Sequence, residues 1–309
     1  MVWLYIALGL LAVVLVGGYA AFYLALVRRP TRDLLQTPYY KEKYGPFFPT
    51  MKAATEKWTA EPCESVTITA FDNTRLCGRL YDHPNPRGTV ILIHGYRANP
   101  IRDFACALDL YRECGLRILT IDQRACGNSG GNYIGMGVLE RHDAASWAWY
   151  VHDRFGARQS IFLSGLSMGA ATVLMATSLP LPENVRGITA DCGFDSGWDI
   201  IAKVVSQDYH LPAWLVMPLI NGYARVLGGF SLRDATAPKA LADNTIPVLF
   251  IHGREDAFVP CEMTERNYAA CASEKRLVIV EKADHGMSYL LEPDRCAAEL
   301  RAFFDKHCV

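Results

Sequence analysis

A seven-residue stretch in the middle of the chain, LSGLSMG, constrains the fold more than any other segment. The run from Ser160 to Leu163 predicts a short buried strand, and the alanine-rich run from Ala170 to Leu179 predicts a helix. Between them lies a G-x-S-x-G pattern with Ser167 at its centre. A turn this tight strains the serine backbone and leaves no room for side chains at the flanking positions, which here are Gly165 and Gly169. The segment therefore predicts a nucleophile elbow.

Two later segments supply an acid and a base in an order that suits this serine. A predicted strand over Pro247–Gly253 leads into a loop with Asp256, and a second over Arg276–Glu281 leads into a loop with His285. Serine, then aspartate, then histidine is the chain order of the triad in folds that use this elbow. We therefore predict that Ser167 is the nucleophile, His285 the general base and Asp256 the residue that orients the histidine.

With these motifs in this order, the sequence resembles the α/β-hydrolase superfamily. It is most similar to small serine hydrolases related to the catalytic domains of prolyl oligopeptidases, some of which are membrane-anchored. The resemblance extends from about Val66 to the C-terminus. It implies a serine hydrolase that cleaves small or lipid-like acyl esters through an acyl-enzyme intermediate. A peptidase or thioesterase of the same fold and a non-catalytic, membrane-tethered binding module are the alternatives, and the complete triad and elbow favour an enzyme.

The resemblance also assigns the oxyanion hole. A His-Gly pair, His94-Gly95, follows the predicted strand Thr89–Ile93. In the hydrolases that the sequence resembles, such a pair shapes a loop that donates one backbone N–H to the oxyanion. The expected donors are the N–H groups of Tyr96 and of Met168, the residue after the nucleophile.

Two other acids compete with Asp256. Asp191 follows the strand after the elbow helix, a position from which some members of the superfamily take their triad acid. Asp284 adjoins His285 in sequence and is badly placed to reach Nδ1 of the same ring. Asp256 lies in a His-Gly-Arg-Glu-Asp loop that matches the family closely, so we expect it to be the acid.

Apolar strands and helical segments alternate over most of the chain, which predicts a mainly parallel sheet with helices on both faces. Glu64–Ala70 and Arg75–Tyr81 predict an antiparallel hairpin at one edge of this sheet. The loop after the strand Arg117–Ile121 carries Asp122 and Arg124, which we expect to fix the loop rather than to catalyse. The fold class is thus α/β, and the resemblance implies an α/β-hydrolase fold, to which the N-terminal apolar run discussed below adds an expected transmembrane helix.

Residues 193–238 interrupt the alternation where this fold takes a helical cap. The segment is rich in aromatic side chains, among them Trp198, Trp214 and Tyr223. Together with Met217, these side chains predict an apolar wall over the active site. The alternative is that they pack the cap onto the body of the domain.

The first residues form a separate unit in this interpretation. Val2 to Val27 contains no charged residue and is long enough to span a membrane as a helix. A cleaved signal peptide would have a basic start and a shorter apolar core. Arg28, Arg29 and Arg32 follow the run and no basic side chain precedes it, so the positive-inside rule predicts a single-pass protein whose catalytic domain is cytoplasmic. The expected division is residues 2–27 as anchor, 28–60 as linker and 61–309 as catalytic domain.

Residues 28–60 are rich in proline and aromatic residues, and the sequence leaves open whether they lie on the membrane or on the domain. The net charge of −1 gives no reason to expect a nucleic-acid partner. The 10 cysteines are scattered singly, without a C-x-x-C pair, so neither a metal site nor a disulfide framework is expected. The triad chemistry needs no cofactor, and the sequence does not indicate an oligomeric state.

Overall fold

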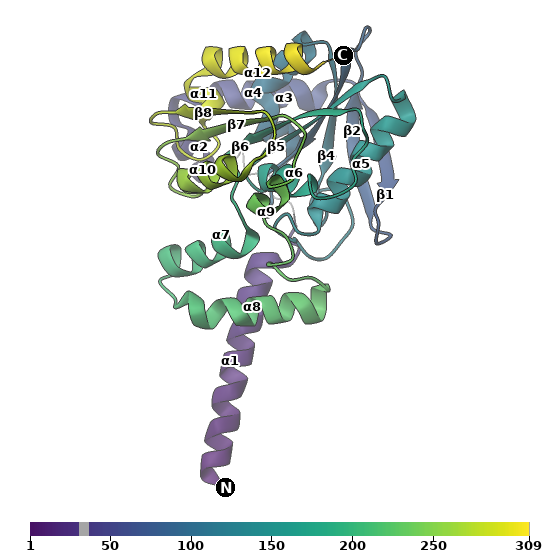
Figure 1. The fold of residues 1–309 in the computed structure, drawn as a ribbon. Coiled ribbons are helices and arrows are strands. Elements are labelled where there is room, and N and C mark those ends of the chain that lie inside the picture. The colour runs from purple at the N-terminus through teal and green to yellow at the C-terminus, as the bar shows by residue number, and fades with distance from the viewer. Residues whose placement is uncertain (31–36, 309) are drawn as a thin grey trace.

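The centre of the fold is an eight-stranded sheet with the strand order β1-β2-β4-β3-β5-β6-β7-β8 (Figure 1). The computed structural model describes residues 1–30 and 37–308. An antiparallel hairpin, β1 (Glu64–Thr69) and β2 (Arg75–Tyr81), lies at one edge, and β2 is also antiparallel to its neighbour β4. The other pairings are parallel and involve β3 (Gly88–Ile93), β4 (Leu116–Asp122), β5 (Ser160–Leu166), β6 (Val185–Asp191), β7 (Val248–Gly253) and β8 (Lys275–Val280). The predictions of a mainly parallel sheet and of an edge hairpin are confirmed.

Helices cover both faces of this sheet (Figure 1). One face carries α3 (Phe48–Ala60), α4 (Pro100–Glu113) and α12 (Pro293–His307), whose core includes Trp58, Tyr111 and Phe304. The other face carries α5 (Glu140–Phe155), α6 (Met168–Ala176), α9 (Ala237–Leu241) and α10 (Cys261–Ala270). Because both faces are covered, β3 and β7 are buried along their whole length, as their unbroken apolar sequences predict.

The loop after β4 is fixed by the two residues expected to do so, but through separate partners. Arg124 forms a buried pair with Asp143, at 2.6 and 2.7 Å, and reaches Asp72 at 2.8 Å. Asp122 accepts the N–H of Asn128 at 2.8 Å. Neither side chain contributes to the site described below.

The described part of the segment between the apolar run and the sheet, residues 37–60, packs on the domain, which answers for these residues the question that the sequence left open. It contains α2 (Pro38–Tyr44) and α3, joined by a short 3₁₀ turn. Trp58 of α3 is buried against Tyr81, with ring centroids 5.3 Å apart, and Lys57 pairs with Asp109 of α4 at 2.7 Å. Arg32, used in the topology argument, lies outside the described residues.

The apolar run forms one helix, α1 (Val2–Leu26), which is long and apolar enough to cross a membrane. Its last two turns belong to the core of the domain, because Phe22 and Leu26 are almost fully buried there. The guanidinium of Arg28 donates to the carbonyl oxygens of Gly127 and Ser129 at 2.9 and 2.6 Å. Only the first part of α1 stands free of the domain (Figure 1).

The cap contains α7 (Gly197–Lys203), a short π-helical turn (Val204–Asp208) and α8 (Ala213–Gly228). The expected apolar wall of cap aromatics over the active site is wrong. Trp214 is on the outer surface, Tyr223 contacts Phe22 of α1, Met217 is buried in the core, and Trp198 lies under the guanidinium of Arg233. These side chains attach the cap to the rest of the protein or form its outer surface, because α8 faces α1 and not the cavity.

Candidate active site

The turn between β5 and α6 has the strained geometry that the glycine pattern predicts. The backbone of Ser167 has a φ of 57° and a ψ of −116°, a conformation that residues other than glycine rarely adopt. A Cβ atom at Gly165 would lie 2.2 Å from the carbonyl oxygen of Gly169, and one at Gly169 would lie 1.8 Å from that of Ile93. Both positions therefore require glycine because neighbouring backbone occupies the space of a side chain.

The structure brings Ser167, His285 and Asp256 together in a chain of two hydrogen bonds. Nε2 of His285 lies 2.9 Å from Oγ of Ser167, and Nδ1 of the same ring lies 2.7 Å from Oδ2 of Asp256. The three residues come from the carboxyl ends of β5, β7 and β8. A proton can therefore pass from the hydroxyl to the ring while the carboxylate stays in contact with the opposite nitrogen.

The carboxylate of Asp256 is buried and surrounded by donors. Its Oδ1 accepts the backbone N–H groups of Phe258 and Val259 at 2.9 and 2.7 Å. Burial by itself would raise the pKa of Asp256, but hydrogen bonds from His252 and His285 outweigh it and hold this pKa well below its usual value. Asp256 is therefore ionised at neutral pH.

His252 is a second histidine on this carboxylate, and the sequence analysis did not single it out. Its Nε2 lies 3.2 Å from Oδ2 of Asp256 and 3.0 Å from the carbonyl oxygen of Val259. Its Nδ1 lies 2.7 Å from the hydroxyl of Thr264, which itself donates to the carbonyl of Gly193. The ring is fully buried at the end of β7, where it fixes Asp256 from the side opposite His285.

The competing acids lie elsewhere in the site. Asp191 is at the end of β6, where its backbone carbonyl accepts the N–H of Ser167 at 2.8 Å and its carboxyl faces Ser288. Burial and the nearby charge of Asp256 raise the pKa of Asp191 to about 7. Asp284 accepts the N–H of Ala257 at 3.1 Å. In the described part of the chain, the Nδ1 atom of His285 is bonded to Asp256 rather than to either of these.

Comparison with known proteins identifies the family. The sequence profile of the Alpha/beta hydrolase family matches residues 90–299, which include the elbow and the loops that carry Asp256 and His285. The chain belongs to the alpha/beta hydrolase family. Among its relatives is the protein YqkD of Bacillus subtilis (strain 168), 30% identical over 226 residues, which cover 73% of this chain and 72% of that protein. YfhR of Escherichia coli (strain K12) is 27% identical over 236 residues, covering 74% and 75%. Both relatives are described as uncharacterized.

Solved structures agree on the fold of this hydrolase. The Pyrococcus furiosus esterase Pf2001 in space group P212121 superposes with a TM-score of 0.66 at 22% identity, covering 92% of this chain and 99% of that one. The esterase EaEST from Exiguobacterium antarcticum gives a TM-score of 0.57 at 20% identity, covering 78% and 100%. Identities this low show a shared fold.

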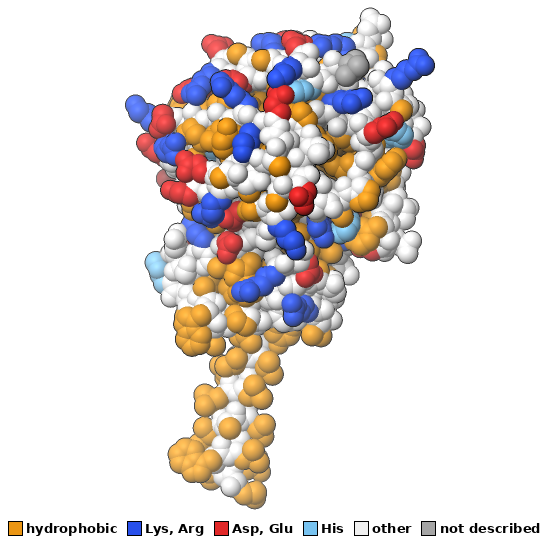
Figure 2. All heavy atoms as spheres, viewed as in Figure 1, with side chains coloured by type: hydrophobic (Ala, Val, Ile, Leu, Met, Phe, Trp, Pro, Cys, Tyr) orange, Lys and Arg blue, Asp and Glu red, His pale blue; other side chains and the backbone are white. Residues whose placement is uncertain are grey.

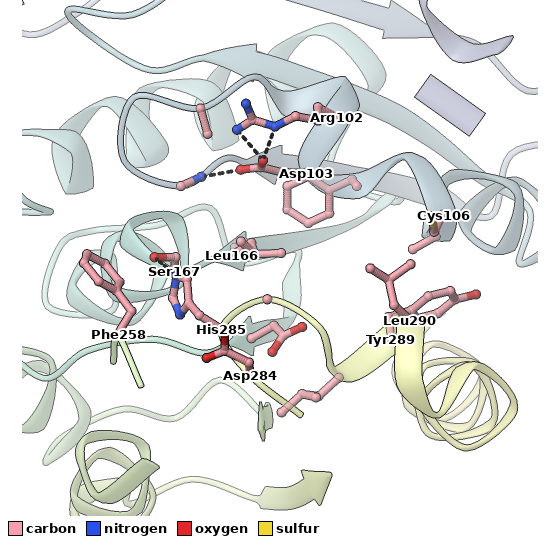
Figure 3. Close-up of a pocket in the computed structure, with 18 of the residues that line it drawn as sticks. Arg102, Asp103, Cys106, Leu166, Ser167, Phe258, Asp284, His285, Tyr289 and Leu290 are labelled. Atoms are coloured by element: carbon pink, nitrogen blue, oxygen red, sulfur yellow. Dashed lines mark hydrogen bonds and ion pairs between the residues drawn. The ribbon is translucent and has the colours of Figure 1, made fainter. Parts of the chain in front are cut away.

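The loop expected to supply one oxyanion donor passes beside the hydrolase's serine. A Cβ atom at Gly95 would lie 3.4 Å from Cβ of Ser167, and the N–H of Gly95 donates to Asp103 at 2.9 Å (Figure 3). Met168 is the first residue of α6, so its N–H is one of the amides that have no partner inside the helix. The hydroxyl of Tyr96 donates to the carbonyl of Ala25 at 2.6 Å, so the end of α1 holds this loop.

A cavity of about 760 Å³ opens at Ser167. Figure 3 shows Ser167, His285 and Phe258 at one end and Cys106, Tyr289 and Leu290 at the other, with Leu166 between them. The second end lies between α4 and α11 (Ser288–Leu291) and is mostly apolar. Charged side chains line other parts of the wall: Glu42, Lys43, Arg102, Asp103, Lys203 and Asp208.

Part of this wall comes from α2, which the sequence analysis assigned to a linker. Tyr40, Lys43 and Tyr44 line the cavity, and the guanidinium of Arg102 lies 5.0 Å from the ring centroid of Tyr40. The clustered tyrosines were a visible signal, but nothing in the sequence says that this segment folds back over the site.

Cys192 brings a sulfur atom close to the hydrogen-bonded chain. Single ligand atoms of Cys192, Asp256 and His285 lie within 4.8 Å of one another, a group that could hold a metal ion. Burial, with Asp191 and Asp256 nearby, raises the pKa of the Cys192 thiol well above its usual value. A protonated thiol is a poor metal ligand, and the other two residues already bond to each other, so the residues present do not fit a metal.

Proposed function

We propose that this hydrolase is a serine hydrolase that cleaves acyl esters through an acyl-enzyme intermediate. The observation that carries the proposal is the hydrogen-bonded chain from Ser167 through His285 to Asp256, with Ser167 on a strained turn at the start of α6. This arrangement gives a nucleophile, a base within hydrogen-bond reach and a group that orients the base.

The first half of the reaction forms the acyl-enzyme. Nε2 of His285 takes the proton of Ser167 while Oγ attacks the carbonyl carbon of the ester. Asp256 keeps Nδ1 protonated, which leaves Nε2 free to accept, and it stabilises the imidazolium that results. The imidazolium then gives its proton to the departing alkoxide, and the acyl group stays on Ser167.

The negative charge that develops on the carbonyl oxygen would be met by the N–H groups of Met168 and Tyr96. Placement at the N-terminus of α6 supports the first of these, and the passage of the Gly95 loop beside Ser167 supports the second. Loss of one such donor costs roughly 10²–10³ in rate. Water, activated by His285, then releases the acid and restores the serine.

The shape of the cavity supports an acyl substrate of some length. The space between α4 and α11 is lined by apolar groups, among them Tyr111, Leu290 and Leu300, and it begins at the nucleophile. Transfer of an alkyl chain into such a space removes apolar surface from water, at roughly 25 cal/mol per Å². Esters with medium or long acyl chains are therefore the proposed class.

We also propose that α1 anchors the enzyme in a membrane and is retained in the mature protein. A signal peptide is cleaved from the mature chain, whereas Phe22 and Leu26 are part of the core here and Arg28 binds the loop after β4. The proposed orientation places the catalytic domain in the cytoplasm, since Arg28 and Arg29 follow the apolar run.

The test of the function is covalent labelling. A fluorophosphonate probe reacts with serines that have an adjacent base, so mass spectrometry of the labelled full-length protein should find the adduct on Ser167. Ser167→Ala and His285→Ala should each abolish labelling. Ser164, buried in β5, is the control: Ser164→Ala should still label at Ser167. A folded protein that gives no adduct would favour a binding module, and an adduct elsewhere would contradict the site.

The substrate class has its own measurement. Hydrolysis of nitrophenyl esters of increasing acyl length, compared with thioesters and peptide amides of the same acyl groups, should give the highest kcat/KM for esters with medium or long chains. A preference for peptide amides or thioesters at every length would replace the ester proposal with that alternative.

A further inference from the structure

We propose that the outer face of the cap helix α8 lies in the interface of the same bilayer that α1 enters. The partner of this surface is therefore the lipid bilayer itself. The inference rests on the proposal that α1 inserts in a membrane, and it goes further by giving the domain a second, peripheral contact with lipid.

The outer face of α8 is apolar where a water-facing helix would be charged. Trp214, Pro218, Gly222 and Val226 follow one another at intervals of four residues and are all exposed, and Trp214 and Val226 are exposed by 80% and 82%. The opposite face, with Met217, Ile220 and Ala224, is buried in the cap. A helix that is apolar on both faces needs a second apolar partner.

The apolar surface continues beyond this stripe. Leu215 and Leu227 are exposed on α8, and Tyr209 and Leu211 are exposed in the segment that leads into it. Figure 2 shows apolar side chains over the free part of α1 and on the adjoining end of the body, while charged, apolar and other side chains are mixed over the rest of the visible face. The two apolar surfaces are neighbours and face the same medium.

Close contacts fix where α8 meets α1. Figure 1 shows α8 lying across α1. A Cβ atom at Gly18 would lie 2.8 Å from Cβ of Leu219, and the hydroxyl of Tyr223 donates to the carbonyl of Leu15 at 2.9 Å. The helices therefore cross in close contact, between Leu15 and Phe22 of α1. Whatever depth α1 takes in a bilayer, α8 is held at a fixed height on it.

The length of α1 before its contact with α8 matches the thickness of a bilayer only if α8 is partly immersed. The part of α1 before the contact, Val2 to Val14, is about 20 Å long at ~1.5 Å per residue. The hydrocarbon core of a bilayer is about 30 Å thick. An interfacial helix sinks its apolar face by about 5–10 Å. Sinking α8 by this amount supplies the length that the free part of α1 lacks.

Polar and aromatic side chains agree with an interface at this level. Arg225 is the one charged residue of α8, and Arg28 and Arg29 follow the end of α1, so basic side chains lie beside the surface. The acidic neighbour, Asp208, is paired with Lys203 at 3.4 Å. Tyr19 and Tyr23 are half-exposed at the level of the contact, where aromatic residues favour the membrane–water boundary. Tyr19 is too deep for a helix that spans the bilayer alone, but it fits an interface set by α8.

The immersed surface begins beside the cavity. Lys203 and Asp208 line the cavity wall, and the exposed apolar side chains begin at Tyr209, the next residue along the chain. A cap held in the interface therefore keeps this side of the cavity close to the lipid headgroups.

The experiment measures the depth of individual tryptophans in the full-length protein. The protein is reconstituted in nanodiscs of ordinary lipid or of lipid brominated in the upper part of the acyl chains, because bromine quenches tryptophan emission at short range. Subtracting the emission of Trp214→Phe from that of the wild type isolates Trp214, and Trp3→Phe and Trp149→Phe isolate the other two probes. Trp149 is the matched control, since it is also exposed but its indole N–H donates to the carbonyl of Pro180 at the amino-terminal edge of the sheet, away from the cap.

The expected result is that brominated lipid removes most of the emission of Trp214 and Trp3 and leaves that of Trp149 unchanged. Quenching of Trp3 without quenching of Trp214 would overturn the inference while leaving the anchor intact. If neither Trp3 nor Trp214 were quenched, the anchor would be overturned as well. If a second copy of the chain covered α8, Trp214 would be shielded from lipid, and an unquenched Trp214 together with a cross-linked dimer would replace the bilayer by that partner.

Discussion

Replacing Asp256 by asparagine should stop catalysis by reversing the tautomer of His285. Oδ1 of Asp256 accepts the backbone N–H groups of Phe258 and Val259. The amide oxygen of asparagine must stay at that position, because an NH₂ group there would face two donors. The NH₂ group therefore takes the place of Oδ2 and donates to Nδ1 of His285. With Nδ1 as an acceptor, the ring proton moves to Nε2, which can no longer take the proton of Ser167.

The expected cost is about 10⁴ in kcat, as for loss of the aspartate in Ser-His-Asp triads generally, or about 5 kcal/mol in the barrier. The fold should survive with a smaller loss. The new NH₂ group also faces Nε2 of His252, which lay 3.2 Å from the carboxylate, and one mispaired buried group costs about 1–3 kcal/mol of unfolding free energy.

The assay is steady-state hydrolysis of a nitrophenyl ester, with near-UV circular dichroism to show that the variant is folded. Asp284→Asn is the matched control, because Asp284 also lines the cavity but its carboxylate accepts the N–H of Ala257. The control should keep its kcat within a few-fold. Near-normal turnover in a folded Asp256→Asn variant would refute the assignment of the acid and with it the tautomer argument.

Four further outcomes are expected. Asp191→Asn should keep its activity. Because the pKa of the native carboxyl is raised to about 7, the wild type should lose unfolding free energy as the pH rises towards 7, and the variant should not. Denaturation of both proteins below and above about pH 7 measures this difference. Gly169→Ala should fail to give folded protein by circular dichroism, whereas the control Gly222→Ala, with open space around it, should gain up to about 1 kcal/mol. Deletion of α1 should lower both the melting temperature and kcat, since the deleted helix fills part of the core and holds the loop beside the nucleophile; wild-type values would contradict this. A reporter fused after His307 should be active in the cytoplasm, and a signal from the other side of the membrane would reverse the orientation.

The local sequence was enough to predict the glycines that close backbone contacts require and the strands that are buried on both faces of the sheet. The glycines around Ser167 are required because backbone atoms lie within about 2 Å of where a Cβ would be, and only glycine satisfies that condition. The apolar strands β3 and β7 could be predicted because a strand covered on both faces has no polar alternation. The order of Ser167, Asp256 and His285 along the chain followed from the same alternation of strands and loops.

The sequence could not choose among acids by physical argument, because several predicted strands end in an aspartate at the same edge of the sheet. The choice depends on which strand lies beside the one that carries His285. In the sheet, β7 is the neighbour of β8 and β6 is one strand further away, so Asp256 reaches Nδ1 and Asp191 does not. His252 escaped notice for the same reason, since its role exists only through its distance to Asp256.

Apolar segments outside the sheet were the hardest to interpret. An apolar side chain has no directional preference, so its sequence says that it avoids water but not whether protein or lipid covers it. The sequence therefore determined that α1 and the cap are apolar, and it determined the residues of the elbow and their order. Only the tertiary structure decided that the end of α1 lies in the core, that α2 closes one side of the cavity and that Trp214 faces outward, because each of these depends on contacts between segments far apart in the chain.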